Sequence, residues 1–308
     1  MSTPFTDAVD PLRALSRSIA HHVALDHRRT WDDRALGLTL GSSSHVQQMR
    51  RDVYEPVFAL VVQGEKQIAL GDQEFTCRAG TFMIVSVDLP IAFRVSRATA
   101  EQPYMALAMT LEPAAIATLL LKSGSGDDRA VPAGSVGMGM SDAPAELLDA
   151  VVRLIRLLDR PQDVAVLGPL IKKEILWRLL CGEQGGQLRQ IGVASSRLAR
   201  IGRTMRWMRE HYREAVAIDD LAHRSAMSVT SFHRNFREVA RMTPLQYLKQ
   251  IRLQEARTRL LASADDVAAV GYAVGYESPS QFSREYKRVY GAPPGRDARL
   301  LRAAHVSK

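Results

Sequence analysis

Residues 228–237 read SVTSFHRNFR, and this short stretch decides how the last third of the chain folds. Phe232 and Phe236 are four residues apart, so in a helix they lie one turn apart on the same side. The polar and cationic side chains of the stretch fall on the opposite side: Thr230, His233, Arg234 and Arg237. The pattern therefore predicts a helix with an apolar back and a front made of hydrogen-bond donors.

The same pattern occurs a second time further along the chain. The segment IDDLAHRSAMSVTSFHRNFREVARMTP, residues 218–244, aligns with VAAVGYAVGYESPSQFSREYKRVYGAPP, which starts at Val267. The offset is 49 residues before the turn and 50 after it, because one residue is inserted there. Each copy predicts a short helix, a turn and a second helix that is capped by Ser228 or Ser278. This is the helix-turn-helix outline, and we place the two motifs at about 218–238 and 267–288.

A third segment joins the two copies. Residues 244–263, PLQYLKQIRLQEARTRLLAS, have apolar side chains at helical spacing: Leu245, Leu248, Ile251, Leu253, Ala256 and Leu260. A single helix here would fix the two copies rigidly, so that both second helices can enter successive major grooves of one duplex. One chain would then contact an asymmetric site with half-sites about 10 base pairs apart.

The positive charge of the chain is concentrated in the same region. The 308 residues include 41 Lys and Arg against 33 Asp and Glu, a net charge of +8. From Arg197 onward there are 21 basic and 11 acidic residues, whereas the residues before it carry 20 and 22. A basic part attached to a nearly neutral part indicates a polyanion partner, although a solvated basic surface would have the same composition.

The fronts of the two second helices supply the candidate contacts to double-stranded DNA. Arginine pairs bidentately with guanine, and Ser, Thr, Gln and His make shorter contacts to base edges. The base-reading candidates are Thr230, His233, Arg234, Ser280, Gln281, Ser283 and Arg284. The candidates for contacts to the DNA backbone are Ser228, Arg237 and Lys287. The alternative for Arg234 and Arg284 is that each binds a phosphate or is only solvated.

The first two thirds of the chain have a different pattern. From about Val53 to Leu111, short apolar strands alternate with turns such as Gly71-Asp72, as is typical of an antiparallel sandwich or small barrel. Two apolar helices follow, ELLDAVVRLIRLLDR, which Pro161 ends, and LGPLIKKEILWRLLCG. We expect these helices to pack on the core and to contribute to a dimer contact.

Residues 182–196, with several Gly and Ser, are the predicted connection between two domains. Three polar residues lie within apolar strand segments upstream of it: Gln63, Lys66 and Ser86. They are the candidates for an effector pocket, since small barrels can hold one ligand inside. The alternative is that each of them simply faces outward from its strand.

Residues 197–303 resemble the DNA-binding domain of the AraC/XylS family of bacterial transcription regulators. The resemblance is carried by LAHRSAMSVTSFHRNFRE, TPLQYLKQIRLQEARTRLL and VGYESPSQFSREYKRVYGAPP. Residues 15–185 resemble the cupin-like N-terminal domain of some AraC-type regulators, through YEPVFALVVQGEKQIALGD, AGTFMIVSVDLPI and LIRLLDRPQDVAVLGPLIKKEILWRLL. The chain departs from the family at Gly271, where alanine is usual, and glycine is a poor helix former.

The resemblance implies an α+β protein: an N-terminal cupin-like antiparallel β-barrel or sandwich with flanking helices, and a C-terminal all-α domain with two helix-turn-helix motifs. It implies a sequence-specific transcription regulator that binds promoter DNA and senses an unknown small-molecule effector in its N-terminal domain. It also implies a possible homodimer, and RNA polymerase as a partner if the protein is an activator.

Two other functions are alternatives to this one. A cupin enzyme needs a cluster of histidines with a nearby glutamate to hold a metal, but there is no histidine between residues 50 and 115. No nucleophile elbow or phosphate-binding loop occurs, so we expect no catalysis, no cofactor and no metal. A non-specific architectural DNA-binding protein would not need two different fronts, with His-Arg in one and Ser-Arg in the other.

The remaining features are consistent with a cytoplasmic protein without a membrane partner. The first ten residues, MSTPFTDAVD, are polar, and no apolar run approaches the roughly 20 residues of a membrane helix. Cys77 and Cys181 form no CxxC motif, and we expect both to be buried as small apolar side chains; the alternative is a redox role.

Overall fold

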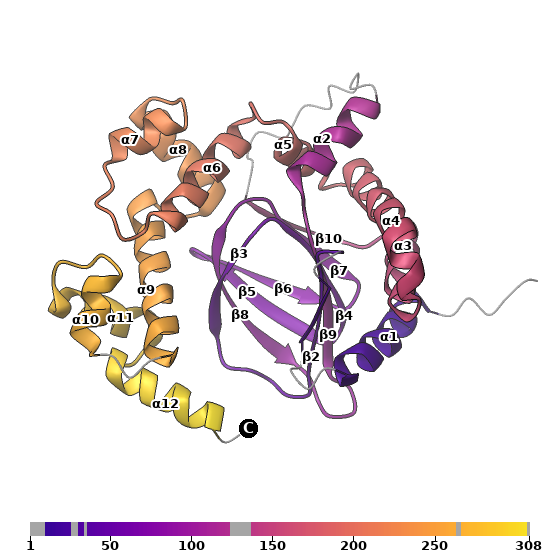
Figure 1. Ribbon diagram of the computed structural model, residues 1–308, viewed down its shortest axis with the longest axis horizontal. Coiled ribbons are helices and arrows are strands. Elements are labelled where there is room, and N and C mark those ends of the chain that lie inside the picture. Colours follow the sequence, from indigo (N-terminus) through magenta and orange to yellow (C-terminus); the bar gives the residue numbers. More distant parts are fainter. Residues whose placement is uncertain (1–9, 26–29, 34–35, 124–136, 263–265, 307–308) are drawn as a thin grey trace, which may run out of the picture.

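The computed structural model describes residues 10–25, 30–33, 36–123, 137–262 and 266–306. A strand-rich half comes first in the sequence, and an all-helical half follows it (Figure 1). The prediction of an α+β protein with antiparallel sheets first and an all-α region second is confirmed.

Two antiparallel sheets lie face to face, and together their strands are called the β-sandwich below (Figure 1). The first sheet has six strands in the order β1-β2-β9-β4-β7-β10: Thr30–Asp33, Leu38–Ser43, Tyr104–Thr110, Val57–Gln63, Thr81–Val85 and Met138–Asp142. The second sheet has four strands in the order β3-β8-β5-β6: Arg50–Tyr54, Leu89–Arg97, Glu65–Leu70 and Gln73–Arg78. The turn Gly71-Asp72 joins β5 to β6, as the sequence predicts.

The strands form where the sequence lets one face be buried. In β2, Leu38 and Leu40 are buried and Thr39 between them is exposed, which is the two-residue period of a half-buried strand. In β7 all five residues are buried, because one face lies in the sandwich core and the other is covered by helices. Three strands lie outside the range that the sequence predicted as strand-rich: β1, β2 and β10.

Helices cover the six-stranded sheet on its outer face. α1 (Pro11–Leu25) lies on β2 and β4, and α3 (Ala145–Arg156) and α4 (Pro161–Cys181) pack beyond it. A short 3₁₀ turn, η1 (Leu157–Asp159), connects α3 to α4, so the first predicted helix ends before Pro161 and that proline begins the second. α2 (Pro113–Lys122) packs on α5 (Gly185–Gly192), which lies within the segment predicted as a connection.

The all-helical half lies on the opposite side, against the four-stranded sheet (Figure 1). Its helices are α6 (Arg197–Glu210), α7 (Ile218–Arg224), α8 (Val229–Ala240), α9 (Pro244–Ala262), α10 (Val267–Ala273), α11 (Pro279–Tyr290) and α12 (Pro294–Val306). We call α7 with α8 unit 1, and α10 with α11 unit 2. α9 runs between the two units and contacts β3 and β8.

Two expectations about single residues are wrong. Leu245 in α9 is 50% exposed, whereas Pro244 and Tyr247 in the same first turn are buried. Cys77 is buried, and burial raises the pKa of its thiol to about 11, but Cys181 is exposed at the end of α4. Among the helices of the described residues, none is long and apolar enough to cross a membrane.

Candidate nucleic-acid interface

In unit 1 the apolar back of α8 is fully buried. Phe232 and Phe236 are both 0% exposed, and their rings meet edge to face with centroids 5.5 Å apart. Phe236 also contacts the ring of Tyr247 on α9 at 5.6 Å. The side-chain oxygen of Ser228 accepts a hydrogen bond from the Ser231 amide, so this serine caps α8 as the sequence predicts.

Unit 2 repeats the arrangement with different side chains. Phe282 and Tyr286 are buried at the back of α11 with ring centroids 5.6 Å apart, and Ser278 caps the helix through the Gln281 amide. Gly271 lies in α10 directly against Phe282, where an added Cβ would come within 3.0 Å of the ring. The glycine that departs from the family pattern is therefore a contact position between the two helices of unit 2.

The two units also use the same backbone conformations in their turns. Ala226 in unit 1 and Gly275 in unit 2 occupy the turn between the helices, with φ of 49° and 91°. Arg241 and Gly291 end α8 and α11 with φ of 56° and 78°. All four residues are in the left-handed region, which costs energy for any residue other than glycine.

The predicted front of each second helix faces solvent. The exposed candidates are Ser228, Thr230, His233, Arg234 and Arg237 in unit 1, and Ser280, Gln281, Arg284 and Lys287 in unit 2. Ser283 is half-buried. The candidates thus form two polar fronts, one on α8 of unit 1 and one on α11 of unit 2. α9 lies between the two units (Figure 1). Such fronts can donate hydrogen bonds to base edges and phosphates in a major groove.

A polar network holds α11 against α9. Glu285 accepts hydrogen bonds from the Lys249 ammonium at 2.7 Å, the Tyr276 hydroxyl at 2.9 Å and the Gln281 amide at 3.2 Å. Burial by itself would raise the pKa of Glu285, but these hydrogen bonds lower it below its ordinary value. Gln281, a base-reading candidate, is therefore positioned by the same carboxylate that fixes the helix.

The contact between the two halves of the molecule could not be predicted from sequence patterns. Asp88, 1% exposed in the turn before β8, has its Oδ2 3.1 Å from Arg209 Nη1 on α6. Arg209 also donates a hydrogen bond to Glu55 at 2.6 Å. Burial raises the pKa of Asp88, and the positive charges of Arg209 and Arg206 oppose that shift. No local pattern links these residues, because they lie more than 100 positions apart.

Unit 1 and the adjoining α9 make further contacts to the β-sandwich. The Tyr247 hydroxyl donates a hydrogen bond to the carbonyl oxygen of Asp88 at 3.0 Å, and burial raises the pKa of that hydroxyl. The Gly137 amide beside β10 donates to the carbonyl oxygen of Val239 in α8 at 3.0 Å. The backbone of α8 is therefore hydrogen-bonded directly to the strand-rich half.

The three effector-pocket candidates have separate surroundings. Gln63 donates a hydrogen bond to the Pro103 carbonyl, and Ser86 accepts one from the Gln187 amide. Lys66 is on the inner side of β5, donates to the Tyr54 hydroxyl at 2.7 Å and lies 4.2 Å from the centre of the Phe93 ring. Within the described residues, no hydrogen bond or ion pair joins the three to one another.

Comparison with known protein families agrees with this geometry. The family of AraC-type transcriptional regulator N-termini matches residues 35–187, and the helix-turn-helix domain family matches residues 221–299. Together the two matches cover about three quarters of the chain. The chain belongs to the AraC-type transcriptional regulators. The matches are to DNA-binding regulators and not to an enzyme family, in agreement with the prediction of no catalysis.

Curated relatives of this AraC-type regulator include the transcriptional activator RhaS. RhaS of Escherichia fergusonii is 34% identical over 107 residues, which are 33% of this chain and 38% of RhaS. RhaS of Salmonella schwarzengrund is 28% identical over 158 residues, which are 49% of this chain and 56% of RhaS. The chain thus spans about half the length of the curated relatives it matches.

The fold of most of the chain is shared with a solved regulator. ToxT of Vibrio cholerae, in a structure with a bound unsaturated fatty acid, matches 87% of this chain and 97% of its own with a TM-score of 0.54. The sequence identity is 8%, so this match bears on the fold alone.

Proposed function

We propose that this AraC-type regulator binds promoter DNA sequence-specifically, with α8 and α11 in successive major grooves. The observation that carries the proposal is the pair of exposed, chemically different fronts on two helices whose backs are fully buried. Arg234 and Arg284 contact bases, while Arg237 and Lys287, one turn further along, contact phosphates. The rival proposal of a non-specific architectural protein does not account for two different fronts.

The experiment is competition binding to DNA that flanks the protein's own gene, in excess random competitor DNA and across a salt series. Arg234→Ala and Arg284→Ala should each cost about 1–3 kcal/mol on the preferred site and much less on random DNA. Arg156→Ala is the matched control, because this exposed arginine lies at the end of α3 on the far side of the β-sandwich. Equal losses on every sequence would show that both arginines bind phosphates.

We further propose that a small-molecule effector bound in the N-terminal half controls DNA binding. The family match supports this, and so does the fatty acid bound in ToxT. Lys66 is the strongest of the three pocket candidates because its ammonium lies on the inner side of β5 among aromatic rings. A ligand acts only if it binds the DNA-competent state with a different affinity. A ligand that changes neither DNA binding nor dimerisation would contradict this part.

The signal has a physical route to unit 1. The ion pairs of Arg209 with Asp88 and Glu55, and the hydrogen bond from Gly137 to Val239, join the β-sandwich to α6 and α8. A shift of the β-sandwich against the helices at 146–181 would reach α8 through these contacts, or would release them.

A homodimer is proposed through α4. Val166, Leu170 and Trp177 are 68%, 61% and 43% exposed and fall on one side of that helix. Sedimentation velocity of the full chain tests this, with Leu170→Glu expected to shift the equilibrium to monomer. A cytoplasmic location, and a contact to RNA polymerase if the protein activates transcription, belong to the same proposal.

A further inference from the structure

A cavity of about 490 Å³ opens between α2 and α4, on the helical layer opposite α9. Its walls are mainly apolar: Leu36, Ala115, Leu119, Val164, Pro169 and Leu176. The volume is within the range of small-molecule sites, which are usually apolar cavities with a few polar groups that fix the ligand. None of the contacts proposed above for DNA or for an effector uses this cavity.

A Gly-Pro pair in α4 shapes the wall. Pro169 lies inside the helix and has no N–H, so the carbonyl of Ala165, one turn earlier, receives no helical hydrogen bond. Both residues line the cavity. At Gly168 an added Cβ would lie 2.6 Å from Leu36 Cδ2, so a larger residue would displace a side chain that forms the wall.

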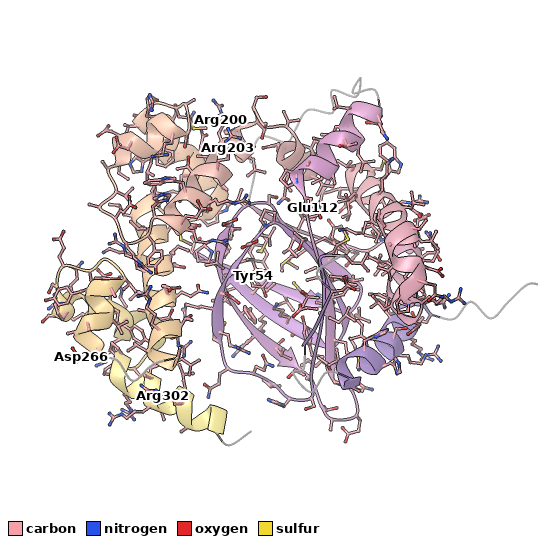
Figure 2. All side chains as sticks on the ribbon, in the orientation of Figure 1. Tyr54, Glu112, Arg200, Arg203, Asp266 and Arg302 are labelled. Atoms are coloured by element: carbon pink, nitrogen blue, oxygen red, sulfur yellow. The ribbon has the colours of Figure 1, made fainter. Side chains whose placement is uncertain are left out.

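The rim carries excess positive charge. Lys172 and Lys173 both line the cavity, and Glu112 is the single carboxylate among the lining residues. Lys172 Nζ is 3.5 Å from Glu112 Oε1, a long ion pair, although the Lys172 side chain is only 16% exposed and that of Glu112 is 60% exposed. Figure 2 shows Glu112 at the foot of α2, above the β-sandwich. A lysine whose side chain is mostly buried and whose carboxylate partner is mostly solvated leaves room for a second anion at the ammonium.

We propose that this cavity binds a small organic anion with an apolar body and a single carboxylate. The apolar walls take the body, and the carboxylate lies between Lys172 and Lys173, with Glu112 turning out to solvent. Two ammonium groups and one carboxylate leave one net positive charge, which matches a monoanion better than a doubly charged phosphate ester. The proposal gives the effector control proposed above a ligand class and a site other than Lys66, and it rests on that function.

Lys173 gives the site a connection to the dimer contact. It lies on the same side of α4 as Val166, Leu170 and Trp177. Counted from Val166, Leu170 is four residues along the helix, Lys173 seven and Trp177 eleven. An anion beside Lys173 reduces the positive charge in the middle of this exposed apolar row. Two such rows then approach each other with less charge repulsion, so occupancy favours the dimer.

The test is isothermal titration of the full chain with octanoate, and with octan-1-ol as the uncharged probe of the same length. Octanoate should bind the unaltered protein, and octan-1-ol at least about tenfold more weakly. Lys172→Gln should weaken octanoate binding at least about tenfold, and Thr118→Trp, at an exposed position that lines the cavity, should block it. Lys122→Gln is the control, because it makes the same change on α2 outside the cavity.

Three outcomes would overturn the proposal: no octanoate binding at about 5 mM, equal binding of octanol, or equal binding by all variants. DNA binding is measured on the same samples without octanoate, and every variant should retain it. If the unaltered protein does not bind DNA specifically, the proposed function is contradicted. The octanoate titration still tests the cavity independently of that result. Sedimentation with and without octanoate tests the dimer connection, which fails if the unaltered protein binds octanoate without a change in association.

Discussion

Unit 1 and unit 2 are copies of one motif, but they obtain their stability from different sources. Phe232, Phe236 and Val239 of unit 1 belong to a hydrophobic core that continues through α6 and α9 into the β-sandwich. Phe282 and Tyr286 of unit 2 belong to a separate, smaller core formed with α9 and α12. A change in the β-sandwich therefore acts directly on unit 1, whereas it reaches unit 2 mainly through α9.

The local backbone shows the same difference. The two left-handed positions are Ala226 and Arg241 in unit 1 and glycines in unit 2. Unit 2 therefore folds without strain at these positions, while unit 1 carries strain that its contacts with the β-sandwich offset. Unit 2 has its own polar anchor instead, in which Tyr286 and Arg257 both donate to Asp297.

The largest expected effects come from emptying each core. Phe232→Ala and Phe282→Ala should each destabilise their unit by about 3–5 kcal/mol, because both rings are fully buried. Hydrogen exchange should show that Phe282→Ala loses amide protection in unit 2 and in the parts of α9 and α12 that share its core, and not in the β-sandwich. Phe232→Ala should lose amide protection in α7 and α8 and, in addition, in β3 and β8. Equal loss of protection across the β-sandwich in both variants would contradict the conclusion that only unit 1 shares its core with the β-sandwich.

A smaller effect is expected at the contact between the halves. Arg209→Ala removes the partner of buried Asp88 and should cost about 2 kcal/mol in urea unfolding, with faster exchange in α6 and α8. Arg206→Ala is the control, since that arginine is 53% exposed and 3.9 Å from Asp88, and it should cost less than about 1 kcal/mol. If the two variants behave alike, the Asp88 ion pair does not hold α6, and through it unit 1, against the β-sandwich.

The strain in unit 1 should be relieved by placing glycine, which unit 2 has at the corresponding position, in the turn of unit 1. Ala226→Gly should stabilise the protein by up to about 1 kcal/mol, because glycine adopts the left-handed turn freely. The reverse change, Gly275→Ala, should destabilise, since its Cβ would also come within 2.7 Å of the Arg213 carbonyl oxygen. Thermal unfolding midpoints of the two variants measure this, and a midpoint lowered by Ala226→Gly would contradict it.

The smallest effect is a pH dependence confined to unit 2. The pKa of Glu285 is lowered in the folded protein, so the unfolded state binds more protons in mildly acidic solution. The stability from Glu285 is therefore complete above about pH 5 and is lost as the pH falls through the lowered pKa. The thermal midpoint of the unaltered protein should fall more between pH 7 and pH 4 than that of Glu285→Gln. Equal falls of the thermal midpoint in both proteins would contradict this contribution of Glu285 to stability.

Much of the helical half could be predicted because its signals are local. The spacing of Phe232 and Phe236, the caps Ser228 and Ser278, and the 50-residue offset each involve neighbours along one helix or turn. The strand-rich half was predicted less completely. β10 pairs with β7 more than 50 residues away, and α5 is stabilised by packing on α2 rather than by its own Gly-containing sequence.

The sequence by itself determined the repeat, the exposed fronts of α8 and α11, and the family to which the chain belongs, because a 3.6-residue period and a capping serine act within a few residues. Only the tertiary structure decided that α6, which packs on unit 1, is joined to the β-sandwich through Asp88 and Arg209, and that a cavity with Lys172 at its rim opens between α2 and α4. Both features bring together residues that are distant in the chain. Their energies come from desolvation and packing, which arise only when the two surfaces meet.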